Sequence, residues 1–294
     1  MNKSNFRLVN EEILREILRK KQILEKNPNY RLHYSNAKKK SLRVEANKRS
    51  VSLELEIYDT HTTIGRRTKA KEQKRCLKNL SNAMEWGLDS YEDDLSHDFI
   101  KCLGHKIEPE LNRDGYRTQK VRIMGASWSP PSPEKIEREM NVFLFENSCL
   151  DNVIDKAVHA HFHIARIHPF TDGNGRSARA IQNIILEKSS FLPAIIKLSE
   201  RLEYTHLLDY AVNSYKMAEG NLSLEFITKL NRLYDSFDKT DISEKDKGYC
   251  KSLVLEFGRA KMTKEQADFY NFMCLKVRDT IREEIDKLYF KGKK

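Results

Sequence analysis

The chain has 294 residues, with 53 basic and 43 acidic side chains and a net charge of +10. The two signs are interspersed, and no helix-turn-helix, zinc-finger or aromatic RNA-binding signature accompanies them, which argues against a nucleic-acid-binding protein. The five cysteines are widely spaced without a CxxC pair, which favours a reducing compartment. The charged N-terminus lacks the apolar run of a secretion signal, and no apolar stretch reaches membrane-spanning length, so we predict a cytoplasmic protein.

Apolar residues at helical spacing predict a mainly α-helical fold. The pattern begins at Ile13, Leu14, Ile17 and Leu18, and it recurs at Leu77, Leu80 and Met84 and again at Ile181, Ile184 and Ile185. We divide the chain into an N-terminal helical segment over residues 1–74, a core domain over residues 75–238 and a C-terminal helical extension over residues 239–294.

Alternating residues in the middle of the chain predict a short β-hairpin. In residues 115–133, GYRTQKVRIMGASWSPPSP, the apolar Val121 and Ile123 alternate with charged neighbours before a glycine turn. Ser132 can then cap a helix that runs through Leu144.

A helix, a tight loop and a second helix are predicted around His168. Pro169 disfavours helical geometry at the residue before it, so the first helix should end at His168 and leave its imidazole at the rim of the loop. Phe170 is the one large apolar residue of the loop, and we expect it to anchor the loop in the core.

The rest of this loop combines groups that bind phosphate and metal. Asp172 offers the carboxylate oxygen that Mg²⁺ prefers. The glycines of Gly173-Asn174-Gly175 let backbone N–H groups converge on an anion at the start of the next helix. Arg176 and Arg179 share one helical face and can clamp phosphate oxygens. Such an arrangement fits phosphoryl or nucleotidyl transfer, in which positioning and charge neutralisation provide most of the catalysis.

The run HPFTDGNGRSAR, residues 168–179, resembles without departure the signature HxFx(D/E)GNGRxxR of the Fic (filamentation induced by cAMP) family. The sequence GYRTQKVRIMG resembles the flap hairpin of that family, and ERLEYTHLL from Glu200 resembles its Arg-x-x-Tyr element. The resemblance implies a Fic-fold helical bundle with a short β-hairpin flap beside the active site.

The resemblance also implies roles for the loop in a protein adenylyltransferase that uses ATP and Mg²⁺. His168 would take the proton from a Ser, Thr or Tyr hydroxyl of a target protein, and Asp172 would hold Mg²⁺. Gly173-Asn174-Gly175 would bind phosphates, while Arg176 and Arg179 would neutralise the β- and γ-phosphates. The product would be a protein that carries AMP.

Residues outside the loop receive roles in the same way. The flap residues Val121, Arg122, Ile123 and Met124 would receive the target by strand addition, which requires little sequence complementarity. Tyr204 would lie near the base and the nucleotide.

Many family members carry an inhibitory helix with the pattern (S/T)xxxE(G/N), and SLRVEAN, residues 41–47, resembles it except that Ala46 replaces the usual Gly or Asn. Ser41 and Glu45 lie on one helical face, and Glu45 would pair with Arg179 and displace the γ-phosphate, so its replacement by glycine should raise activity. A second frame, Ser50 to Glu54, has the same spacing, but its surrounding stretch SVSLELEI alternates like a strand. A solvated Glu45 without a role is the simpler alternative.

Other readings remain open. The same site can transfer UMP or phosphocholine or remove AMP, or the chain can be a catalytically silent module that binds a partner when it holds nucleotide. Among His159, His161 and His163, the first and last have the spacing of a zinc pair, but no glutamate lies between them, so we expect packing or surface histidines. The closing helix, from about Thr263 to Leu288, should pack on the core or form a homodimer.

Overall fold

The computed structural model describes residues 8–27, 30, 36–55, 63–220 and 262–290. In this part of the chain the fold is mainly α-helical, as predicted. The linker expected from Asp235 and the boundary expected at residues 238–239 lie outside the described residues. The boundary expected at residues 74–75 falls within one 28-residue helix.

The helices follow in this order along the chain: α1 (Glu11–Lys26), α3 (Asn36–Leu55), α4 (Thr63–Ser90), α5 (His97–Ile107), the 3₁₀ turn η1 (Pro133–Lys135), α6 (Ile136–Ser148), α7 (Val153–Ile167), α8 (Asn174–Lys188), the 3₁₀ turn η2 (Leu198–Glu200), α9 (Arg201–Gly220) and α12 (Lys264–Phe290). No helix in these ranges has the length and apolar character needed to cross a bilayer.

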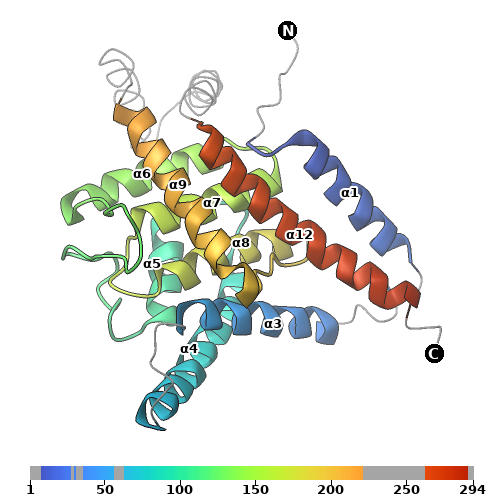
Figure 1. The fold of residues 1–294 in the computed structure, drawn as a ribbon, viewed down its shortest axis with the longest axis horizontal. Helices are drawn as coiled ribbons and strands as arrows, with labels where there is room; N and C mark the ends of the chain where they lie inside the picture. Colours follow the sequence, from blue (N-terminus) through green and yellow to red (C-terminus); the bar gives the residue numbers. More distant parts are fainter. Residues whose placement is uncertain (1–7, 28–29, 31–35, 56–62, 221–261, 291–294) are drawn as a thin grey trace.

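The helices α7 and α8 form the centre of the molecule and pack against each other (Figure 1). The last residue of α7 and the first of α8 are joined by the loop that carries the predicted site. All residues of α7 from Ala157 to Ile167 are buried, because α6, α8 and α12 all pack on this helix. A helix that is buried on every side is a rigid support for the loop at its end.

The outer helices surround this pair. Helices α4 and α5 pack against each other and against α8, and α3 lies across α4 and α8 (Figure 1). Helix α12 packs on α9, α7 and α1, and it buries Phe269, Phe272, Val277 and Ile281. The closing helix is therefore part of the core, as one of the two alternatives predicted.

The predicted β-hairpin is not confirmed as a paired structure. Residues 115–133 contain no β-ladder, although Gly125 has φ of 81° and Ala126 donates to the carbonyl of Ile123 in a turn. An isolated two-stranded ribbon is marginally stable in water, and no third strand lies beside this segment in the described residues. Ser132 precedes η1 in extended backbone but makes no side-chain cap to it.

Candidate functional site

His168 terminates α7 in a strained backbone conformation. Its N–H donates to the carbonyl of Ile164 over 3.0 Å, while its φ of 53° and ψ of 56° place it in the left-handed region. Non-glycine residues rarely adopt this region, and they do so where the surrounding structure imposes it. The helix thus ends at the residue predicted from Pro169, and the chain turns sharply there.

The loop after His168 is held from both ends by side-chain amides. Asn174 donates from Nδ2 to the carbonyl of Phe170 over 2.9 Å and accepts from the Phe170 N–H at Oδ1 over 2.8 Å. Asn112 donates to the carbonyl of Asp172 over 2.9 Å. The ring of Phe170 is fully buried under Gly104, where an added Cβ would lie 2.3 Å from it. Phe170 is the anchor that was expected, and the Asn174 amide fixes the loop.

The N-terminus of α8 is built to approach an anion closely. Gly173 is its N-cap with φ of 76°, and a Cβ there would lie 3.0 Å from Ile107. The next residues, Asn174, Gly175 and Arg176, provide the first N–H groups of the helix, which have no partner within the helix itself. These groups and the helix dipole favour a negative charge at this point.

Arg176 is buried among carboxylates. Its Nε lies 2.6 Å from Glu54, its Nη1 lies 2.5 Å from Glu108, and its Nη2 lies 3.1 Å from Asp172. Cys76 also contacts Nη1 over 3.1 Å, and burial raises the pKa of its thiol to about 12, so the sulfur is uncharged. The guanidinium is therefore fixed in one orientation at the start of α8.

Arg179 is held by the end of α3. Its Nε donates to Ser50 Oγ over 2.7 Å, and its Nη2 donates to the Ser50 carbonyl over 3.1 Å and to Glu54 over 2.7 Å. On its other side lies the buried Tyr204, whose hydroxyl is 2.9 Å from His161 Nε2. Glu54 thus bridges both arginines.

Comparison with known proteins agrees with this geometry. Residues 94–186 match the family model described as Fic/DOC family. This part of the chain is a Fic domain. The segment includes the whole loop from His168 to Arg179, together with Arg117 and the residues that were expected to form the flap.

Two curated relatives of the Fic domain are named protein adenylyltransferases. The Nematostella vectensis protein adenylyltransferase Fic is 30% identical over 190 residues, which are 61% of this chain and 42% of the relative. The Caenorhabditis elegans protein adenylyltransferase fic-1 is 33% identical over 116 residues, or 38% of this chain and 22% of the relative. The chain therefore spans less than half the length of the curated relatives it matches.

Solved structures match the fold over nearly the whole chain. A Fic domain-containing signaling protein from Bacteroides thetaiotaomicron has a TM-score of 0.62 at 18% identity, with 96% of this chain and 98% of that chain covered. A fragment of Fic-1 from C. elegans has a TM-score of 0.58 at 18% identity, with 95% and 73% covered. The mainly helical Fic fold is thus confirmed.

The structure of α3 corrects the contact that was predicted between Glu45 and Arg179. Ser41 is exposed, and Glu45 pairs with Arg49 over 2.7 Å with its side chain 42% exposed. The contacts with Arg179 come from Ser50 and Glu54 instead, since α3 continues as a helix to Leu55 and places these two residues on one face. The alternation from Ser50 to Leu55 reflects a helix end that is buried on several sides, with Val51, Leu53 and Leu55 in the core.

Two buried residues that contact the site, Arg117 and Glu108, were not found from the sequence. Arg117, which is 4% exposed, donates from Nε to the carbonyl of His168 over 2.8 Å and from Nη2 to the carbonyl of Pro131 over 2.7 Å. Glu108, which is 1% exposed, binds Arg176 on one side and Arg75 on the other. Arg117 fastens the flap segment to the loop, and Glu108 orients Arg176.

The flap segment lies at the surface of the Fic domain. Met124 is 78% exposed and Arg122 is also exposed, while Val121 and Ile123 are half-buried. The base of the segment is tied to α9, because the Ser127 N–H donates to Asp209 over 2.8 Å.

Proposed function

We propose that this chain is a protein adenylyltransferase, which transfers AMP from ATP to a Ser, Thr or Tyr hydroxyl of a target protein and releases pyrophosphate. The observation that carries the proposal is the α8 N-terminus, where backbone donors, Arg176 and Arg179 converge one loop away from His168. The curated names of the relatives support the same activity.

His168 is the proposed general base. Its Nδ1 lies 3.3 Å from the Ala165 carbonyl, which favours the tautomer with the proton on Nδ1 and leaves a lone pair on Nε2. Burial lowers the pKa of His168 to about 4, so the ring is neutral at physiological pH. In the reaction, the target hydroxyl gives its proton to Nε2 as its oxygen attacks the α-phosphorus, and the bond from the α-phosphorus to the pyrophosphate oxygen breaks.

The α8 N-terminus is the proposed triphosphate site. The N–H groups of Asn174, Gly175 and Arg176 receive phosphate oxygens, and the two arginines neutralise the charge that builds up on the leaving pyrophosphate. Tyr204 lies beside Arg179. Burial raises the pKa of Tyr204, so its hydroxyl keeps its proton.

Asp172 is the residue that would hold Mg²⁺. Its carboxylate is half-exposed at the edge of the triphosphate site, and an accessible carboxylate beside phosphate-binding groups fits an ion that is held by one or two carboxylates, phosphates and water. When bound, the ion neutralises phosphate charge. Asn112 holds the backbone of Asp172 and so orients this carboxylate.

Glu54 is the proposed autoinhibitory residue. Its carboxylate lies over Gly175, where an added Cβ would be 2.7 Å from Oε1, so it fills space beside the N–H groups that phosphate requires. It also pairs with Arg176 and Arg179. ATP with its full triphosphate must therefore displace this carboxylate to bind productively.

The flap segment is the proposed docking site for the target. Its exposed backbone around Ile123 and Met124 can accept an extended target segment by main-chain hydrogen bonds. The link from Arg117 to both the segment and the His168 carbonyl would align the bound segment with the base.

We expect the rate at which the protein labels itself with AMP to stay nearly constant between neutral pH and about pH 5, and to fall only as the pH nears 4. His168 accepts a proton only when it is neutral, and an ordinary histidine, with a pKa of about 6.5, would lose activity below pH 6. The measurement is the initial rate of self-labelling by the Glu54→Gly protein at ATP concentrations far below saturation, where the pH dependence reports the free protein. Glu54 itself raises the pKa of His168, so its removal does not bring the pKa closer to 6.5. A loss of activity centred near pH 6.5 would contradict this assignment.

The position of the isotope in ATP identifies the group that is transferred to the protein. The Glu54→Gly protein should become labelled with ATP that carries the isotope at the α-phosphate and stay unlabelled with γ-labelled ATP, and mass spectrometry should find AMP on a hydroxyl side chain. Labelling from the γ-position would indicate phosphate transfer, and labelling only from α-labelled UTP would indicate UMP transfer. Either result would replace adenylyl transfer as the function.

A further inference from the structure

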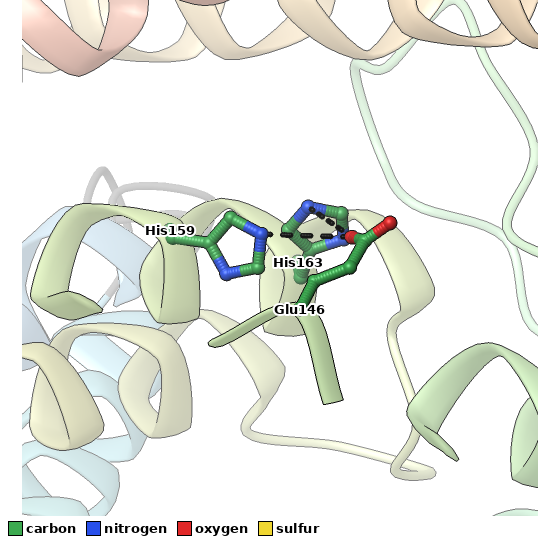
Figure 2. A group of neighbouring side chains, drawn as sticks. All are labelled: Glu146, His159 and His163. Atoms are coloured by element: carbon green, nitrogen blue, oxygen red, sulfur yellow. Dashed lines mark ion pairs between the residues drawn. The ribbon is translucent and has the colours of Figure 1, made fainter. Parts of the chain in front are cut away.

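Three buried side chains with metal-binding atoms meet where α6 packs on α7, apart from the triphosphate site. His159 Nε2 lies 3.6 Å from Glu146 Oε2, and His163 Nε2 lies 4.0 Å from the same oxygen. Figure 2 shows both rings from α7 turned toward the carboxylate from α6. All three ligand atoms lie within 4.8 Å of one another, and the residues are between 1% and 8% exposed.

Helical spacing places His159 and His163 on one face of α7 and His161 on another. His159 and His163 are four residues apart on α7, so their rings lie on one face with centroids 4.2 Å apart. His161 lies between them in the chain but contacts Gln182 and Tyr204. The glutamate that the sequence lacked between the histidines is provided by another helix.

We propose that Glu146, His159 and His163 form a zinc site that is independent of adenylyl transfer. Two imidazole nitrogens and one carboxylate oxygen are a ligand set that zinc uses, with water in the fourth position. Bonds of about 2.1 Å in a tetrahedral site separate ligand atoms by about 3.4 Å. The two nitrogen-to-oxygen separations of 3.6 and 4.0 Å exceed this value by less than an ångström, and no separation among the three ligand atoms exceeds 4.8 Å.

The surrounding charges are compatible with a divalent cation. The nearby cation is Arg166, which is 2% exposed and pairs with Glu139 over 2.8 Å, so its charge is offset by a second carboxylate. Asp155 is also buried and, with Glu146 and Arg166, acts on Tyr270. The buried carboxylates in this region therefore outnumber the buried arginine, and nitrogen ligands favour zinc over magnesium.

Zinc binding requires a change in two hydrogen bonds. His159 Nδ1 lies 3.2 Å from Asn147 Nδ2, and His163 Nδ1 lies 3.2 Å from Arg166 Nη2. Both contacts favour rings with the proton on Nε2, whereas a ligating ring presents its lone pair there and carries the proton on Nδ1. The change would require rotation of the Asn147 amide, whose Nδ2 also donates to the Lys156 carbonyl over 2.8 Å, and a shift of the Arg166 guanidinium, which pairs with Glu139 over 2.8 Å. The bound ion would then fasten α6 to α7, the helix that ends at His168.

The test is titration of the metal-free protein with zinc chloride at mildly alkaline pH, where the imidazoles are neutral. We expect one zinc per chain and a raised melting temperature, and Co²⁺ in place of zinc should give the visible absorption of a four- or five-coordinate site. Glu146→Gln keeps the shape of the side chain but removes its charge, and it should weaken zinc binding roughly tenfold or more. His163→Asn should do the same.

The matched control is His206→Ala, which removes an exposed histidine on α9 and should leave zinc binding unchanged. Circular dichroism of each variant without metal separates a lost site from a lost fold. The proposal is overturned if zinc does not bind, in which case the three residues are a hydrogen-bonded core cluster. It is equally overturned if folded Glu146→Gln and His163→Asn proteins bind zinc as tightly as the parent.

Discussion

Replacing Glu54 by glycine should raise self-labelling from α-labelled ATP by about 10- to 100-fold. The carboxylate makes charge-assisted bonds of 2.6 Å to Arg176 and 2.7 Å to Arg179, and such bonds contribute about 1.5–3 kcal/mol each. A ligand that must break one such bond loses about 10- to 100-fold in affinity, because each 1.4 kcal/mol is a factor of ten. The measurement is the initial rate of AMP incorporation at ATP concentrations below saturation.

Glu45→Gly is the matched control, because it places the same glycine in the same helix. Both substitutions weaken α3 by up to about 1 kcal/mol, but only the first removes a carboxylate from the arginines. Glu45 pairs with Arg49 at the surface, so its loss should leave labelling unchanged. Equal activation by both variants would mean that loosening α3 is what matters, and the contact of Glu54 would then not be the inhibitory one.

The loop could be predicted from the sequence because its geometry is local. Pro169 ends one helix, Gly173 supplies the left-handed turn, and Arg176 and Arg179 are brought to one face by helical periodicity alone. The buried Phe170 ring follows from the same few residues. Each of these features depends on neighbours within about one or two turns of helix, which the sequence displays directly.

The choice between Glu45 and Glu54 could not be made from the sequence because it depends on tertiary packing. Both glutamates follow a serine by four residues, and both lie in one continuous helix. Burial of Leu53 and Leu55 and the bond from Arg201 of α9 to the Leu53 carbonyl fix the end of α3 in the core. There Ser50 and Glu54 contact Arg179 of α8. Alternation over a few residues does not distinguish a strand from such a deeply buried helix end.

The contacts of Glu108 and Arg117 with the site were also not predicted, because they join residues that are far apart in the sequence. Glu108 and Arg176 are 68 residues apart, and Arg117 binds a carbonyl 51 residues away, so neither contact has a signal in local spacing. The sequence favoured packing or surface histidines on α7 over a zinc pair, and the structure buries His159, His161 and His163. What the sequence could not show is that Glu146 reaches the same point from α6.

Replacing His168 in the Glu54→Gly background should reduce self-labelling by about 10²- to 10⁴-fold, the usual contribution of a general base. We expect this result for His168→Ala and equally for His168→Asn. Asparagine tolerates the left-handed backbone at this position better than alanine does, so it preserves the turn while it lacks a basic nitrogen.

Nucleotide binding is the readout that assigns this loss to proton transfer. The donors proposed for the triphosphate lie on α8, and the His168 side chain contacts only the Ala165 carbonyl among the hydrogen bonds found in the described residues. The His168→Asn protein should therefore bind ATP within about threefold of its parent, which is well under 1 kcal/mol. If ATP affinity fell in parallel with labelling, His168 would be holding the loop or the nucleotide, and the base would have to be sought elsewhere. If labelling persisted while ATP still bound, the target hydroxyl would be losing its proton to solvent, and the chemical role given to the strained end of α7 would be wrong.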